Sequence, residues 1–104
     1  MSGNNFRNDI IENIAKLHRR VKEIVAELEK YDVFESVTSC VYYMTDNNAE
    51  EYPKTRVWYV NITAETRREK GTHRYEFDMT DEIPNEILFE LEIWFRGIKK
   101  FMSE

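Results

Sequence analysis

The sequence predicts a two-layer α+β domain, in which two helices cover one face of a three-stranded antiparallel sheet. Three observations predict this fold class. Apolar residues recur at helical spacing near both ends of the chain, three segments between them alternate apolar and polar residues, and short connections join these segments. The resulting element order is α-β-β-β-α, with both helices on one face of the sheet. We expect residues 1–104 to form a single domain, because no internal repeat or domain boundary interrupts the pattern.

The first predicted helix spans residues 6–31. Its apolar residues recur every three or four positions, which places them on one face. They are Phe6, Ile10, Ile14, Leu17, Val21, Ile24, Val25 and Leu28.

Three strands are predicted next, from Val33 to Met44, from Arg56 to Thr63 and from Thr72 to Met79. All three are rich in β-branched and aromatic residues, and each alternates between two faces. The connections are a loop at residues 45–55 and a turn at Gly71, so the strands form an antiparallel meander.

The second predicted helix begins between Thr80 and Asn85 and runs to about Met102, with Pro84 tolerated in its first turn. Projected at 100° per residue, its core face comprises Ile83, Ile87, Leu88, Leu91, Trp94, Phe95, Ile98, Phe101 and Met102. Phe89 and Ile93 lie on the opposite, polar side. Either they contact a neighbouring loop such as 45–55, or they form an interface with another chain.

Charge is distributed unevenly along the chain. The segment from Glu76 to Glu92 carries seven carboxylates and no Lys or Arg, within a chain of net charge −5. Outside this segment, 13 acidic residues accompany 15 basic ones. We therefore predict a partner-binding surface on the last helix, formed by Glu82, Glu86, Phe89, Glu90 and Ile93 and suited to a basic surface on another protein.

This surface indicates a small, acidic, non-enzymatic protein-protein interaction module that acts as an inhibitor or adaptor. Phage-encoded anti-defence proteins and toxin-immunity proteins are analogous in size, charge and lack of motifs. Homodimerisation through Phe89 and Ile93 is a variant of the same hypothesis, because burying the pair would contribute about 2 kcal/mol per residue.

Residues able to perform catalysis are few and scattered. His18 lies at the edge of the first helix's apolar arc and His73 on the inward side of its strand, so we expect both to be half-buried structural residues. They do not lie at metal-ligand spacing with each other or with Cys40, and Cys40 has no flanking nucleophile motif. The sequence therefore predicts no enzyme activity, no cofactor and no metal site.

Two other surfaces are candidates for binding. One is a basic cluster at the second hairpin, formed by Arg67, Arg68, Lys70 and Arg74, which would contact phosphate groups or an acidic partner. The other is the uncovered face of the sheet. It would present Cys40, Tyr42, Val57, Tyr59, Asn61, Arg74, Glu76 and Asp78, either solvated or as a binding face.

The α-β-β-β-α order resembles that of the double-stranded-RNA-binding domain and of the related core of ribosome-hibernation factors. The resemblance implies RNA or ribosome binding, with lysines at the start of the last helix contacting phosphates and the hairpin loop supporting them. Here that helix start reads Thr80-Asp81-Glu82-Ile83-Pro84-Asn85-Glu86, which would repel phosphate. Nucleic acid is therefore the alternative partner, using the basic hairpin, and a basic protein surface is the leading one.

Cysteine usage and hydropathy predict a cytoplasmic location. The chain has one cysteine, no charged-then-apolar leader pattern, and no apolar run long enough to span a membrane.

Overall fold

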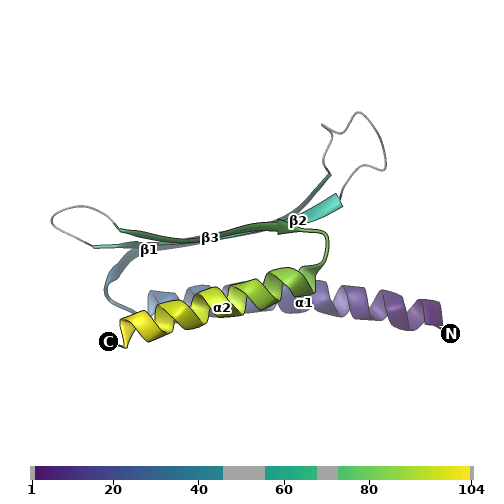
Figure 1. Cartoon of the computed structure of the whole chain (residues 1–104), viewed down its shortest axis with the longest axis horizontal. Coiled ribbons are helices and arrows are strands. Elements are labelled where there is room, and N and C mark those ends of the chain that lie inside the picture. Colours follow the sequence, from purple (N-terminus) through teal and green to yellow (C-terminus); the bar gives the residue numbers. More distant parts are fainter. Residues whose placement is uncertain (1, 46–55, 68–72, 104) are drawn as a thin grey trace.

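A computed structural model of the protein describes residues 2–45, 56–67 and 73–103, with side chains for residues 11–43, 57–67 and 73–103. The elements are helix α1 (Ser2–Glu29), strands β1 (Phe34–Thr45), β2 (Arg56–Thr66) and β3 (Arg74–Asp81), and helix α2 (Pro84–Met102). The strands form one antiparallel sheet in the order β1-β2-β3, and both helices lie beneath the same face of it (Figure 1). The predicted two-layer α+β fold is confirmed.

The apolar stripe of α1 forms one side of the core. Leu17, Val21, Ile24 and Leu28 are buried, as their helical spacing predicts. The side chains of Phe6 and Ile10, which were predicted for the same stripe, lie outside the described ones. The helix begins four residues earlier than predicted and ends at Glu29 rather than Tyr31.

The register of the sheet separates an apolar inner face from a polar outer face. Three cross-strand rows line the inner face: Val37–Ala64–Tyr75, Ser39–Ile62–Phe77 and Val41–Val60–Met79. Because successive residues of a strand point to opposite faces, the intervening rows point away from the helices. Those outer rows are Thr38–Thr63–Glu76, Cys40–Asn61–Asp78 and Tyr42–Tyr59–Thr80.

Strand β2 continues three residues beyond its predicted end at Thr63. Ala64 and Glu65 are weak strand formers, so local propensity does not indicate the extension. Burial in the folded protein explains the extension, because Ala64 and Thr66 are both buried. In addition, the Thr66 hydroxyl donates to the His73 carbonyl and accepts from the His73 amide, each at 3.2 Å. These bonds join the two strands at the second hairpin. β3 begins at Arg74, and its predicted start at Thr72 lies outside the described residues.

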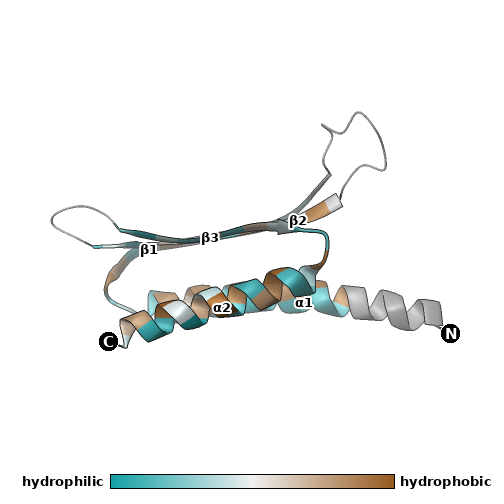
Figure 2. Ribbon diagram, in the orientation of Figure 1, coloured by the Kyte–Doolittle hydropathy of each residue, from teal (hydrophilic) through white to brown (hydrophobic). Residues whose placement is uncertain are grey.

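Helix α2 begins at Pro84, inside the predicted window, and ends at the predicted Met102. The Ile83 amide donates to Asp81 Oδ1 at 2.8 Å, and this turn directs the chain from β3 into the helix. Apolar and polar residues alternate around α2 with helical period (Figure 2). The buried members of its core face are Pro84, Ile87, Leu91, Phe95 and Ile98.

The predicted core face was wrong at two positions. Ile83 and Phe101 were expected to be buried, but each is 54% exposed. Ile83 is the N-cap residue with extended backbone (φ −111°, ψ 113°), so a helical projection does not apply to it. Phe101 lies at the edge of the arc, where its ring meets Tyr75 of β3 with centroids 5.8 Å apart. Since β3 is an edge strand of the described sheet, no further strand of that sheet covers the outer side of the ring.

Candidate protein-interaction surface

Four of the five residues predicted to bind a partner lie on the side of α2 that faces away from the sheet, and the fifth, Glu82, lies in the turn just before the helix. We call Glu82, Glu86, Phe89, Glu90 and Ile93 the outer face of α2. All five are exposed, and Phe89 and Ile93 remain 64% and 48% accessible. With that much of each side chain accessible, the two residues do not form part of the core. The expectation that they lie on the polar side of the helix is confirmed.

The outer face of α2 changes charge along its length. Glu86 and Glu90 lie in the first half of α2 and Glu82 lies just before it; Glu86 is in the first turn, where a carboxylate suits the positive end of the helix dipole. The second half of α2 is basic: Arg96, Lys99 and Lys100 are all exposed, the two lysines lie in the last turn, and Lys99 Nζ lies 4.7 Å from the centroid of the Phe95 ring. One helix therefore presents an acidic half and a basic half around a central apolar pair.

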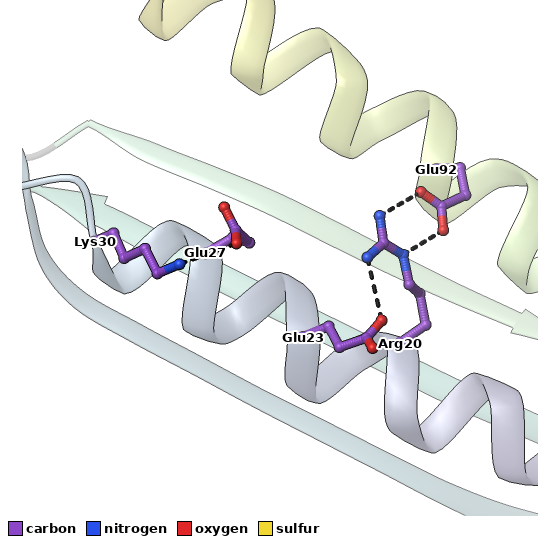
Figure 3. A network of polar contacts seen from close by, with 5 residues as sticks. All are labelled: Arg20, Glu23, Glu27, Lys30 and Glu92. Atoms are coloured by element: carbon purple, nitrogen blue, oxygen red, sulfur yellow. Dashed lines mark hydrogen bonds and ion pairs between the residues drawn. The ribbon is translucent and has the colours of Figure 1, made fainter.

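An ion pair joins α2 to α1 at the edge of the core that the two helices share. Arg20 donates from both Nε and Nη2 to the Glu92 carboxylate, with Nη2 to Oε1 at 2.8 Å, and it contacts Glu23 at 3.3 Å (Figure 3). The Arg20 guanidinium also lies 5.4 Å from the centroid of the Phe95 ring. This two-point contact is stronger and more directional than a single hydrogen bond.

Both members of the pair have shifted pKa values. The hydrogen bonds from Arg20 lower the pKa of the Glu92 carboxyl, against the opposing effect of desolvation. The same bonds raise the pKa of Arg20. Of the seven carboxylates in the acidic segment, Glu92 is therefore engaged within the molecule and is not part of the outer face.

Further exposed apolar surface lies next to the outer face, and sequence reasoning missed it. These residues are Ile83 and Phe101, which were expected in the core, and Gly97. Gly97 is exposed, and a Cβ built on it would meet no atom within 4 Å. A signal was present in the sequence, because Phe89, Ile93, Gly97 and Phe101 are spaced at four-residue steps.

The outer face of the sheet is a second exposed surface, with its polar groups already paired. The Tyr59 hydroxyl donates to Asp78 at 2.9 Å, and the Asn61 amide donates to both Glu76 (3.1 Å) and Asp78 (3.2 Å). The hydrogen bond to Asp78 is the main cause that raises the pKa of the Tyr59 phenol. These carboxylates keep their charge, but neighbouring neutral donors already occupy part of their hydrogen-bonding capacity, which leaves less of it for a basic partner.

Aromatic residues extend this sheet face toward the first hairpin. Tyr42 packs against Tyr59 with ring centroids 5.0 Å apart, and Tyr42 remains exposed. Cys40 is exposed in the next row. The face has the predicted composition, but its side chains mostly contact one another.

The basic hairpin is only partly described, because Arg68 and Lys70 lie outside the described residues. Arg67 is exposed, and its backbone amide donates to the Val33 carbonyl at 2.8 Å. Arg74 of β3 forms an ion pair with Glu65 of the adjacent strand β2 at 3.2 Å, so it is less available to an external partner. Where the RNA-binding resemblance places lysines, at the start of α2, this chain has Glu86 in the first turn and Glu82 just before the helix.

His18 and His73 are exposed, which corrects the expectation that they are half-buried. His18 meets the edge of the Trp58 ring at 6.1 Å, and His73, which precedes the first residue of β3, lies 4.6 Å from the Tyr75 ring. Among the described residues, no three His, Cys, Asp or Glu side chains lie close enough together to hold a metal ion. None of the described helices is sufficiently long and apolar to cross a membrane.

Comparison of the chain with protein-family models, with curated proteins and with solved structures found no match.

Proposed function

We propose that this protein is a non-enzymatic interaction module, an inhibitor or adaptor, that binds a basic protein surface through the outer face of α2. The observation that carries the proposal is the exposure of Phe89 and Ile93 among three carboxylates, on a helix whose opposite side is buried. Apolar side chains at the centre of a charged rim are the usual composition of a protein interface.

Energetics support this surface over the alternatives. Burying Phe89 and Ile93 would contribute about 2 kcal/mol each, whereas leaving them in water contributes nothing to folding. The carboxylates around them add attraction to Lys and Arg and speed encounter with a basic target. On the sheet face, by contrast, Glu76 and Asp78 already accept hydrogen bonds from Asn61.

Photo-crosslinking in an extract of the source cells tests the proposal. A photoreactive phenylalanine analogue that replaces Phe89 should form a covalent adduct with a protein. The adduct should be lost when Glu82, Glu86 and Glu90 are changed to Lys in the same chain. The matched control carries the analogue at Tyr42, an exposed aromatic on the sheet face, and should not give the same adduct.

Two outcomes contradict the proposal. Absence of any adduct from position 89 would show that the apolar pair has no partner. An adduct that survives the three Lys substitutions would show that the carboxylates do not take part. Circular dichroism of the triple variant must show a folded chain, because Lys in the first turn of α2 opposes the helix dipole by about 0.5 kcal/mol.

A further inference from the structure

Four exposed residues of α2 form a continuous row. We call Phe89, Ile93, Gly97 and Phe101 the α2 ridge. They are spaced at four-residue steps, and rows of this kind are the ridges that pack between two helices. The three large members are 64%, 48% and 54% exposed, so the ridge is apolar along its whole length.

The glycine in this ridge has no explanation within the described part of the molecule. A Cβ at position 97 would meet no atom within 4 Å, so intramolecular packing does not require a glycine there. Glycine inside a helix lowers its stability relative to alanine. A missing side chain on an exposed ridge does leave a depression that can receive a large side chain from another helix.

The charges of α2 are complementary to those of a second copy of α2 when the two helices run antiparallel. Acidic residues flank the first half of α2 and basic residues flank the second half. If two copies of α2 pack antiparallel about Ile93, Glu86 comes level with Lys100, and both lie within about 20° of the direction in which Ile93 points from the helix. The same arrangement places Phe89 over Gly97. A parallel pair would instead bring like charges together.

We infer that the partner of the outer face of α2 is a second copy of this chain, packed antiparallel along the α2 ridge about a two-fold axis near Ile93. This inference rests on the proposed function and names the basic group that it requires, which is Lys100 of the second copy. Such an interface is isologous, so each stabilising contact occurs twice.

Charge reversal followed by mixing tests the orientation. Glu86→Lys places two lysines level in each half of the homodimer, and Lys100→Glu places two glutamates level. Each variant alone should dimerise about tenfold more weakly than the parent in sedimentation equilibrium. An equimolar mixture of the two should recover near-parental association, because the mixed dimer restores an opposite-charge pair at both positions. Recovery on mixing is expected only if residue 86 of one copy contacts residue 100 of the other.

Substitution of Gly97 tests whether the two α2 helices approach each other closely at this position. Gly97→Leu fills the depression and should abolish dimerisation, while circular dichroism shows an unchanged or higher helix content. Ile11→Ser is the matched control, because Ile11 is an exposed isoleucine of α1 and its loss should leave the dimer intact.

A parent that remains monomeric up to about 1 mM would overturn the inference. So would a mixture of Glu86→Lys and Lys100→Glu that associates no better than either alone. The photo-crosslinking experiment at position 89 distinguishes failure of the dimer inference from failure of the proposed function. An adduct with the chain itself supports the second copy. An adduct with a different protein overturns the second copy and leaves the proposed function standing, and no adduct overturns both.

Discussion

At the scale of single residues, Arg20 and Glu92 connect parts of the chain that are 72 positions apart. The pair is half-buried, with each side chain about one-third accessible, so solvent screens part of its interaction. Its stabilising effect depends on the ionised form of Glu92. The lowered pKa therefore means that this stability is fully present above the carboxyl's usual pKa of 4.5 and is lost as pH falls through the folded-state pKa.

We expect Glu92→Gln to lower the free energy of unfolding by about 1 kcal/mol at pH 7. The difference from the parent should stay constant between neutral pH and the carboxyl's usual pKa, and should shrink below it. Urea titrations at several pH values measure this difference. Arg20→Met should give the same pH profile. If its difference from the parent persists under acid conditions, the ion pair is not the source of the pH dependence.

Gly97 is the second residue with a distinct expectation. Because a Cβ at position 97 meets no atom, Gly97→Ala should raise the free energy of unfolding by about 0.5–1 kcal/mol. The measurement belongs in a Phe89→Ser background and at low protein concentration, so that self-association does not contribute. A destabilised variant would show that position 97 is packed against the rest of the chain.

At the scale of elements, α2 performs two tasks on opposite sides. Leu91 on its inner side is buried, whereas Phe89, two positions earlier, is exposed. A step of two residues turns a helix by 200°, which is sufficient to move a side chain from solvent into the core. One helix can thus stabilise the fold and present a contact surface independently.

The two sides should respond differently to truncation. Leu91→Ala should lower the free energy of unfolding by about 2–5 kcal/mol, because it leaves a cavity in the core. Phe89→Ala should change it by less than about 0.5 kcal/mol in the monomer. Thermal or urea denaturation of the matched pair measures both. A large effect of Phe89→Ala at monomer concentrations would place that ring in the core.

At the scale of the whole molecule, the layers place the two candidate surfaces on opposite sides. The sheet's outer face points away from the helices, and the outer face of α2 points away from the sheet (Figure 1). A dimer through the α2 ridge would therefore leave the outer face of the sheet uncovered in both copies.

Net charge leads to an expectation about nucleic acid. The chain is at −5 and the helix start is acidic, so a short RNA duplex should not be retarded in a gel at physiological salt. Low salt provides the more sensitive test. A retarded band there that disappears with Arg67→Ala and Arg68→Ala would instead favour the RNA-binding alternative.

The sequence by itself determined the element order, the C-terminal end of α2 and the outward direction of Phe89 and Ile93. These features follow from local periodicity: side chains repeat every 3.6 residues in a helix and every two in a strand, so the pattern alone assigns them to faces. The partner-binding role of the outer face remains a prediction.

Only the tertiary structure decided which positions at the edges of those patterns are covered. The exposure of Phe101 depends on β3 being the edge strand, and the length of β2 depends on burial of Ala64 and Thr66. The Arg20–Glu92 pair and the Tyr59–Asp78 bond likewise depend on helix packing and strand register. The physical reason is common to all of them: they join residues distant in sequence, whose meeting is set by packing and not by local periodicity.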